Sequence, residues 1–287
     1  MFMPTIATQV PGLLTTIKSE HDWLKKVVVQ YNIDAVISDN RYGLYHDTIP
    51  CFIMTHQLQV MSGWGSTVDN IVRKLHYKYL DKFNECWIVD DAETGLAGKL
   101  SHPAVLPQRS AYMGLLSQLS QVEKPGEGYL LVLLSGPEPQ RSILSDMLWQ
   151  QLKHYDGKVV FVEGSMNTTA KTNIPAHITY HQQIVKAELE KILSGADIVI
   201  CRSGYSTLMD LVRLNKKAIL IPTPGQTEQE YLAEYLRNKG IFTSAKQNDF
   251  DLMKCLDIAS RFEFKRPGYK AAFDIYKQVI DSMIAGL

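Results

Sequence analysis

The feature that most constrains the fold is a regular alternation of apolar runs and helical segments between residues 129 and 239. The apolar runs occupy residues 129–134, 159–162, 198–201 and 218–221. Uninterrupted runs of this kind are typical of parallel strands that are buried on both faces of a sheet. The sequence therefore predicts an α/β fold in which residues 126–287 form a doubly wound parallel domain.

The first 125 residues follow the same alternation less completely. The expected elements are strands at 35–38, 51–54 and 87–89, a weaker strand near 104–106, and helices at 20–31 and 67–82. A doubly wound domain ordinarily opens with a strand, a Gly-rich turn and a helix. We find no counterpart of that unit and expect an incomplete first domain over residues 1–125. The boundary is expected in the Pro- and Gly-containing run at 123–128.

Composition argues against several classes of protein. The chain has 30 basic and 30 acidic residues among 287, whereas duplex binders carry a basic excess, so no nucleic-acid partner is expected. Its four cysteines form no C-x-x-C pair and match no zinc spacing, which predicts buried thiols in a reducing compartment. No apolar stretch approaches the ~20 residues that span a bilayer, and the N-terminus lacks the pattern of a signal peptide. We therefore expect a cytoplasmic protein, soluble or peripheral to a membrane.

The strongest chemical signal follows the apolar run at 198–201. The residues that carry it are Arg202, Ser203, Gly204, Ser206, Thr207 and Asp210. Backbone N–H groups at a helix start suit a diphosphate, and Gly204 allows it to approach closely. Asp210 lies one turn beyond Thr207, where its carboxylate can accept both hydroxyls of a ribose. The alternative is a helix that is merely well capped by Ser and Thr.

Two further turns follow neighbouring strands of the predicted sheet. After residues 218–221 the helix start carries Gln226, Gln229 and Glu230, whose amide and carboxylate groups suit sugar hydroxyls. A capping box formed by Thr227 and Glu230 is the structural alternative. After residues 129–134 the turn carries Gly136, Gln140 and Arg141, of which Arg141 has the reach to bind a phosphate. Strands of one parallel sheet end at the same edge, so the three turns are expected to form one nucleotide-sugar site.

Residues 196–240 resemble the C-terminal domain of glycosyltransferase family 28, which includes the lipid II-forming N-acetylglucosaminyltransferase of peptidoglycan synthesis. The family shows an Ala-Asp pair, an apolar strand and a Cys-Arg-Ser-Gly run, as residues 196–204 do here. An acidic residue stands six positions after the glycine, typically Glu in the family and Asp210 here. A proline-ended strand and a Gln-rich helix start come next, matched by Pro222, Gln229 and Glu230.

The resemblance implies a GT-B fold with two Rossmann-like domains, in which a last helix at about 270–285 crosses back to the first domain. It also implies a UDP-sugar donor, with UDP-N-acetylglucosamine as the leading candidate, and transfer to an acceptor hydroxyl with inversion. The helix start would stabilise the leaving diphosphate without a bound metal, and no cofactor is expected. Asp249 and Asp251 match a D-x-D metal motif formally, but their position before a helix favours capping.

Polar residues also follow two strands of the first domain, where they are expected to face the acceptor. They are Asp39, Asn40 and Arg41 after the first strand, and His56 and Gln57 after the second. Similar enzymes carry a His-centred turn at the second place, so His56 is the candidate general base. A structural histidine is the equal alternative. Because the Gly-rich turn of the family is missing, the chain as given is expected to bind nucleotide but to transfer sugar poorly.

The helix expected at 67–82 suggests contact with a membrane. Its apolar stripe is formed by Val68, Ile71, Val72, Leu75 and Tyr79, with Trp64 before it and Arg73, Lys74, Lys78 and Lys82 beside it. A basic amphipathic helix of this kind can rest on an anionic lipid surface, which would suit a lipid-linked acceptor. The alternative is that the stripe packs on the sheet of its own domain.

Two other functions remain open on the sequence. One is a sugar-nucleotide epimerase on the same two-domain scaffold, which would need no acceptor. The other is a non-catalytic chain that holds the nucleotide without turnover.

Overall fold

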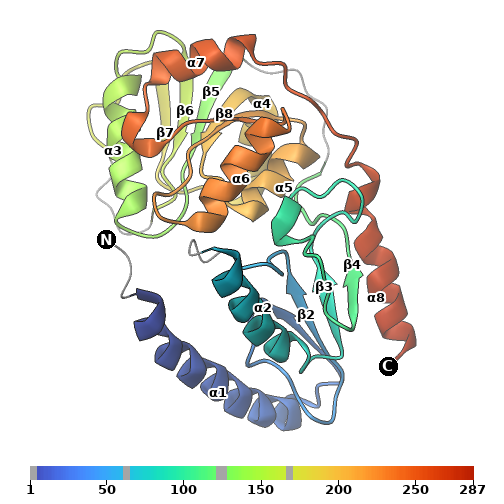
Figure 1. Ribbon diagram of the computed structural model, residues 1–287. Helices are drawn as coiled ribbons and strands as arrows, with labels where there is room; N and C mark the ends of the chain where they lie inside the picture. Colours follow the sequence, from blue (N-terminus) through green and yellow to red (C-terminus); the bar gives the residue numbers. More distant parts are fainter. Residues whose placement is uncertain (1–4, 61–64, 121–127, 166–170) are drawn as a thin grey trace. The chain divides into compact units, whose positions relative to one another are not determined.

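The computed structural model describes residues 5–60, 65–120, 128–165 and 171–287 (Figure 1). The chain divides into two compact units: residues 1–115 with 270–287 form unit 1, and residues 116–269 form unit 2. The division falls between Leu115 and Leu116, ten residues before the expected boundary at 125/126. Leu116 already contacts unit 2, because its backbone N–H donates to the sulfur of Met209 at 3.3 Å.

Unit 1 contains a four-stranded parallel sheet in the order β1-β2-β3-β4. Its elements are α1 (Thr5–Tyr31), β1 (Val36–Asp39), β2 (Cys51–Thr55), α2 (Ser66–Leu80), β3 (Glu85–Ile88), η1 (Gly98–Leu100), β4 (Ser110–Tyr112), η3 (Ala271–Phe273) and α8 (Ile275–Ala285). The weaker strand expected near 104–106 is wrong, since the fourth strand forms at Ser110–Tyr112. Helix α1 is also longer than the expected 20–31.

The core of unit 1 lies around the central strands β2 and β3. It consists of the buried residues Cys51, Ile53, Leu58, Leu80, Phe83, Cys86 and Ile88. Burial raises the pKa of the Cys86 thiol to about 12, so that thiol stays protonated and inert at neutral pH. All four cysteines are buried and free, as the composition predicted.

Unit 2 contains a six-stranded parallel sheet in the order β10-β9-β8-β5-β6-β7. Its elements are β5 (Tyr129–Leu133), α3 (Gln140–Leu152), β6 (Lys158–Val162), β7 (Ile178–His181), α4 (Lys186–Gly195), β8 (Ala196–Cys201), α5 (Tyr205–Arg213), β9 (Lys217–Leu220), α6 (Thr227–Asn238), β10 (Thr243–Ser244), η2 (Gln247–Asp249) and α7 (Leu252–Arg261). This is the doubly wound domain that the sequence predicted.

The strand order of unit 2 shows where a ligand is expected. The chain starts in the middle of the sheet at β5, moves outward through β6 and β7, and then returns to the other side of β5 with β8. The order therefore reverses between β5 and β8. In open α/β sheets, ligands bind outside the carboxyl ends of the strands at such a switch point.

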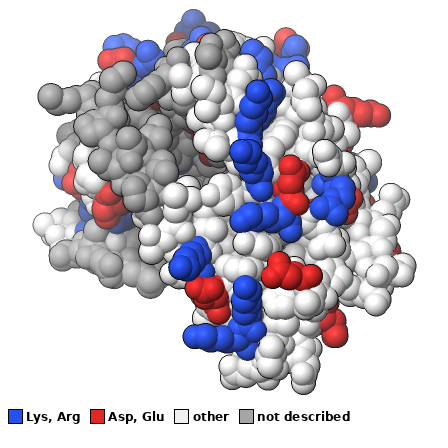
Figure 2. Space-filling view, turned by 60° about the horizontal axis from the view of Figure 1, so that its bottom comes forward, with Lys and Arg blue, Asp and Glu red and all other residues white. Residues whose placement is uncertain are grey.

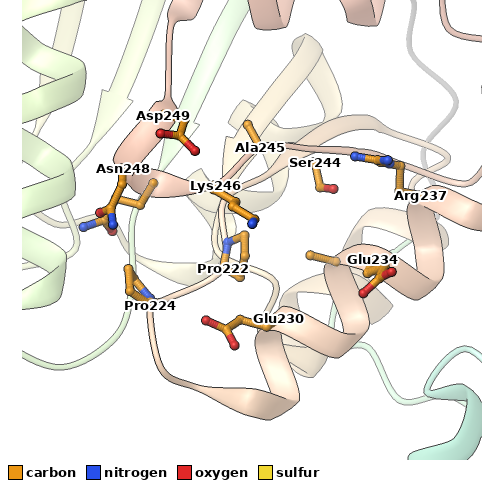
Figure 3. Close-up of a pocket in the computed structure, with 12 residues that line it drawn as sticks. Pro222, Pro224, Glu230, Glu234, Arg237, Ser244, Ala245, Lys246, Asn248 and Asp249 are labelled. Atoms are coloured by element: carbon orange, nitrogen blue, oxygen red, sulfur yellow. The ribbon is translucent and has the colours of Figure 1, made fainter. Parts of the chain in front are cut away.

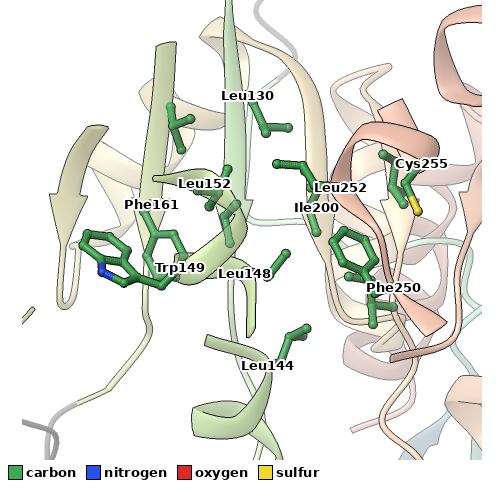
Figure 4. Close-up of a cluster of buried hydrophobic side chains, with 14 of the residues drawn as sticks. Leu130, Leu144, Leu148, Trp149, Leu152, Phe161, Ile200, Phe250, Leu252 and Cys255 are labelled. Atoms are coloured by element: carbon green, nitrogen blue, oxygen red, sulfur yellow. The ribbon is translucent and has the colours of Figure 1, made fainter. Parts of the chain in front are cut away.

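The core of unit 2 fixes α3 and α7 against one face of this sheet (Figure 4). Leu144, Leu148 and Leu152 of α3 are fully buried against β5 and β6, and Trp149 lies edge-on to Phe161 with ring centroids 5.3 Å apart. Leu252 and Cys255 of α7 complete the cluster. The packing holds the start of α3 in place, beside the carboxyl end of β5.

On the face of the molecule that Figure 2 shows, Lys and Arg side chains are interspersed with Asp and Glu side chains. This distribution agrees with the net charge of +0. No helix in the described part of the chain is long and apolar enough to cross a membrane.

Candidate functional site

Arg202 joins the three turns that the sequence singled out in unit 2. Its side chain is only 2% exposed and donates to the carbonyl oxygens of Ile221 at 3.1 Å, Pro222 at 3.2 Å and Gln140 at 2.7 Å. Burial lowers the pKa of the guanidinium to about 10, so it remains charged at neutral pH. Arg202 therefore holds the ends of β8 and β9 and the start of α3 together, with its donors directed at backbone rather than at a ligand.

The start of α5 is open, in contrast to the buried Arg202. Gly204 is the N-cap, and α5 has no side-chain capping bond, so the capping alternative is not realised there. A Cβ built on Gly204 would meet no described atom within 4 Å. Ser206 is exposed and Thr207 is half-buried. A helix start with open space above it and hydroxyls in its first turn is suited to an anionic group.

Ser203 and Asp210 flank this helix start. The Ser203 hydroxyl is buried and donates to the carbonyl oxygen of Gln229 at 2.8 Å, which ties α5 to α6. Asp210 Oδ1 accepts a hydrogen bond from the Ser117 hydroxyl at 2.6 Å. Burial raises the pKa of Asp210, and the bond from Ser117 and the charge of Lys186 lower it in part. Asp210 is thus a partly buried carboxylate on the same helix as Ser206 and Thr207.

The polar side chains at the start of α6 fold back on their own turn. Gln229 Oε1 accepts from the backbone N–H of Thr223 at 3.0 Å, and its Nε2 donates to Gln226 Oε1 at 2.6 Å. Glu230 Oε1 accepts from the backbone N–H of Gly225 at 2.9 Å. The helix has Gln226 at its N-cap without a side-chain capping bond, whereas the capping-box alternative placed Thr227 at that position. These bonds give the turn a defined shape.

The three predicted residues after β5, which are Gly136, Gln140 and Arg141, have different structural roles. Gly136 has φ +104°, a conformation that favours glycine. Gln140 takes part in the network through its backbone carbonyl, and its side chain accepts from Gln247 Nε2 at 3.1 Å. Arg141 is buried, pairs with Glu138 and donates to the carbonyl oxygen of Glu163 at 3.2 Å. The guanidinium of Arg141 is thus engaged within unit 2.

A cavity of about 750 Å³ adjoins α6 at the carboxyl ends of β9 and β10 (Figure 3). Its lining includes Pro222, Glu230, Glu234, Arg237, Ser244, Lys246 and Asp249. Glu230 was predicted from the sequence, whereas Arg237 and Lys246 were missed. Lys246 lies just after β10. Because that strand has only two residues and no apolar run, the sequence pattern did not predict it. The cavity offers carboxylates, cations and a hydroxyl, which are the groups that bind polar ligands.

In unit 1, the structure places the predicted acceptor-side residues at the carboxyl ends of β1 and β2. Asp39 and Asn40 are exposed, and Asn40 has φ +55°. Arg41 forms an ion pair with Glu20 of α1 at 2.8 Å. His56 follows β2 directly, and the backbone N–H of Gln57 donates to Thr55 Oγ1 at 3.1 Å.

Sequence reasoning missed the loop that supports the His56 turn. Asp90 is fully buried after β3, and its carboxylate accepts from the backbone N–H groups of Leu96 at 2.7 Å and Ala97 at 2.9 Å and from the Ser101 hydroxyl at 2.5 Å. The backbone N–H groups of residues 58 and 59 then donate to the carbonyl oxygen of Leu100 at 2.7 and 2.9 Å. The only signal in the sequence was an acidic pair at the end of a strand.

The D-x-D match has a structural explanation. Asp251 is the N-cap of α7, and its side chain accepts from the backbone N–H of Lys254 at 3.0 Å, as predicted. Among the residues that the structure describes, no three His, Cys, Asp or Glu side chains are grouped so as to hold a metal ion.

Comparison with sequences of known proteins points to unit 2. Residues 140–258 match the family model of the glycosyltransferase family 28 C-terminal domain. The chain is 30% identical over 135 residues to the UDP-N-acetylglucosamine–N-acetylmuramyl-(pentapeptide) pyrophosphoryl-undecaprenol N-acetylglucosamine transferase of Caldanaerobacter subterraneus, which covers 44% of this chain and 37% of that protein. The transferase of the same name from Listeria welshimeri is 32% identical over 127 residues, or 42% of this chain and 34% of that protein. The match thus spans little more than a third of the length of these curated relatives.

Comparison with solved structures extends the likeness to both units. MurG of Acinetobacter baumannii has a TM-score of 0.52 at 15% identity, covering 96% of this chain and 78% of that one. The glycosyltransferase SnogD of Streptomyces nogalater has a TM-score of 0.57 at 13% identity, covering 91% and 74%. The UDP-GlcNAc 2-epimerase of Neisseria meningitidis, solved with UDP-GlcNAc, has a TM-score of 0.60 at 9% identity, covering 95% and 82%. The chain therefore has the GT-B fold, and residues 140–258 of its second unit match the glycosyltransferase family 28 C-terminal domain.

Proposed function

We propose that the chain is a glycosyltransferase that binds a UDP-sugar at the carboxyl ends of β5, β8 and β9. The observation that carries the proposal is the open start of α5 at Gly204, with Ser206, Thr207 and Asp210 on the same helix. The diphosphate would lie over the helix start, where backbone N–H groups and the helix dipole favour negative charge. Asp210 would accept the hydroxyls of the ribose.

The donor sugar is proposed to lie beside α6. Glu230 both shapes the turn at residues 223–226 and lines the cavity of about 750 Å³. Carboxylate and amide groups recognise sugars because each hydroxyl donates and accepts. UDP-N-acetylglucosamine is the proposed donor, in line with the names of the relatives from Caldanaerobacter and Listeria.

During transfer, the acceptor hydroxyl would attack the anomeric carbon with inversion, and the leaving UDP would be stabilised by the α5 start. Fixed dipoles aimed at the charge that develops on a leaving group are an effective source of transition-state stabilisation. No metal ion and no cofactor enter this proposal. His56 is the proposed general base, since it stands at the carboxyl end of a central strand of unit 1.

Loss of the Asp210 carboxylate tests the nucleotide site. We expect Asp210→Ala to weaken UDP binding by about 1–3 kcal/mol, because ribose hydroxyls would lose their acceptor in a partly buried site. Titration calorimetry on the full chain measures the change. Asp197→Ala is the matched control, since Asp197 is exposed near the opposite, amino end of β8 and should leave UDP affinity unchanged. Equal affinities of the Asp210 variant and the native protein would remove the ribose assignment.

An epimerase is the second candidate, because UDP-GlcNAc 2-epimerases of Listeria monocytogenes and Neisseria meningitidis share the fold with TM-scores of 0.57 and 0.60. The two activities differ in what they need, since an epimerase converts the sugar nucleotide without an acceptor. Incubation with UDP-N-acetylglucosamine alone separates them. An epimeric sugar nucleotide among the products would replace the transferase proposal.

The acceptor is proposed to be lipid-linked, as the printed names of the curated relatives specify a pyrophosphoryl-undecaprenol compound. Helix α2 is the proposed membrane contact. Its buried residues are His76 and Leu80, and of the predicted stripe Val68, Val72 and Tyr79 are half-buried. Ile71 and Leu75 remain 57% and 53% exposed, beside Lys74 and Lys78. An exposed apolar pair flanked by lysines suits an anionic lipid surface.

Flotation with vesicles that contain anionic phosphatidylglycerol tests this contact. We expect the native chain to float at low salt and the double variant Ile71→Ser, Leu75→Ser to lose most of its bound fraction. The matched control is Met253→Ser, Ile258→Ser, which removes an equally exposed apolar pair from α7 in unit 2. Absence of the native chain from the floating fraction at low salt would leave α2 without a membrane role.

A further inference from the structure

The proposed ribose carboxylate already has one partner, and that partner comes from a distant part of the chain. Ser117 lies in residues 116–120, 93 residues before Asp210, and its hydroxyl donates to Asp210 Oδ1 at 2.6 Å. The Ser117 hydroxyl oxygen in turn accepts a hydrogen bond from the backbone N–H of Leu119 at 3.1 Å. The hydroxyl thus accepts from Leu119 and donates its own proton toward the carboxylate. The orientation of the bond is therefore set by the backbone.

The segment that carries Ser117 is anchored on both sides. Before Ser117, the backbone N–H of Leu116 donates to Met209 Sδ at 3.3 Å, and Met209 precedes Asp210 on α5. After Ser117, the backbone N–H of Ser120 donates to Glu190 Oε1 of α4 at 3.0 Å. These two anchors hold the segment independently of the Ser117 side chain. Both anchors persist when that hydroxyl is removed, and the only backbone group of the described segment that loses its acceptor is the N–H of Leu119.

A carboxylate offers about four lone-pair positions on its two oxygens. Ser117 occupies one on Oδ1, and within the described residues no side chain or backbone group is bonded to Oδ2. Two neighbouring ribose hydroxyls need one acceptor each, so the positions that Ser117 leaves free suffice. The bond from Ser117 also restricts rotation of the carboxylate about its last torsion, which is otherwise broad.

We propose that Ser117 is a positioning residue that fixes the Asp210 carboxylate for recognition of the 2′- and 3′-hydroxyls of the bound nucleotide. This inference rests on the proposed UDP site. It assigns a role in nucleotide selection to the segment at residues 116–120, which lies outside the part of the chain that matches the family model. A rigid acceptor discriminates better between a ribose and a deoxyribose, because the orientation has been fixed before binding.

Titrations of the full chain with UDP and with 2′-deoxy-UDP test the role of Ser117. We expect the native protein to prefer UDP by about tenfold, the usual consequence of one well-made hydrogen bond to a charged acceptor. In Ser117→Ala we expect this preference to shrink to about threefold or less, through weaker binding of UDP and little change for 2′-deoxy-UDP. Ser117→Thr keeps the hydroxyl and should restore the preference. Ser120→Ala is the matched control, since among the described residues Ser120 is bonded through its backbone N–H alone.

The pH dependence of UDP binding gives a second readout. Burial raises the pKa of Asp210, whereas the Ser117 bond and the charge of Lys186 on α4 lower it. Loss of the Ser117 bond therefore raises the pKa further, and on acidification the variant should lose affinity at a higher pH than the native protein. The ionisation of UDP itself is common to both proteins and cancels in the comparison.

The outcomes separate the inference from the function on which it rests. If native protein binds UDP and Ser117→Ala keeps both its affinity and its preference for ribose, the positioning role is wrong while the UDP site stands. A threonine variant that fails to restore the preference, although near-UV circular dichroism shows native packing, also overturns the inference. If the native chain does not bind UDP at millimolar concentration, the proposed function itself fails.

Discussion

Replacement of Arg202 by methionine is expected to lower the free energy of unfolding of unit 2 by about 3–5 kcal/mol. Methionine fills a similar volume but donates no hydrogen bond. The carbonyl oxygens of Ile221, Pro222 and Gln140 would lose their shared donor in a buried setting. Each unsatisfied buried group costs on the order of 1–3 kcal/mol. Because Arg202 follows β8 and the three carbonyls lie at the end of β9 and the start of α3, UDP binding should be lost as well.

Hydrogen exchange measured by mass spectrometry is the suitable assay for Arg202, because it reports on each unit separately. Protection of amides in residues 198–201 and 217–220 should fall, while protection in unit 1 stays the same. Arg261→Met is the matched control, since Arg261 is exposed and its ion pair with Asp257 is worth about 0.5 kcal/mol or less. Native exchange in the Arg202 variant would show that the guanidinium does not hold the turns.

Substitution of Asp90 by alanine is expected to destabilise unit 1 by about 3–5 kcal/mol. The buried carboxylate is the common acceptor for the backbone N–H groups of Asp91, Leu96 and Ala97 and for the Ser101 hydroxyl. Without it, the N–H groups lose this acceptor, whereas the Ser101 hydroxyl keeps the Gly98 carbonyl oxygen at 3.1 Å. The loop also supplies the Leu100 carbonyl that receives the N–H groups of residues 58 and 59, so the turn that carries His56 should loosen too.

The measurement for Asp90→Ala is the exchange rate of the amides at residues 58, 59, 96 and 97, together with the denaturant midpoint of unit 1. Asp34→Ala is the control, because Asp34 is exposed just before β1 and its loss should change stability by less than about 0.5 kcal/mol. Unchanged protection at residues 58 and 59 in the Asp90 variant would mean that the His56 turn stands without this loop.

Several features of the candidate site were predictable because they are local. The switch from an apolar run to Ser203-Gly204 marks the end of β8 and the start of α5 within a few residues. The cap at Asp251 was predictable for the same reason, since a carboxylate before a helix start reaches the N–H group three residues ahead. The predicted position of the fourth strand of unit 1 was wrong because β4 has only three residues, all of intermediate burial. Such a strand contains no apolar run by which it could be recognised in the sequence.

The roles of individual polar side chains were less predictable. Arg141 was expected near a phosphate, but it is buried against Glu138 and the Glu163 carbonyl. Gln229 was expected to contact the donor sugar, but its amide is bonded to Thr223 and Gln226. An arginine or glutamine at a turn binds a ligand or the protein's own backbone with the same donors. Which of these it does depends on neighbours that come from other strands.

The sequence by itself determined the α/β class, the doubly wound second unit and the strand ends at which the candidate site lies. The physical reason is that buried parallel strands require uninterrupted apolar runs, and helix starts require particular residues within one turn. Only the tertiary structure decided that Arg202 binds three carbonyls and that Ser117 meets Asp210 across 93 residues. Those contacts depend on the strand order β8-β5 and on the path of residues 116–120, and no local pattern of side chains encodes either of them.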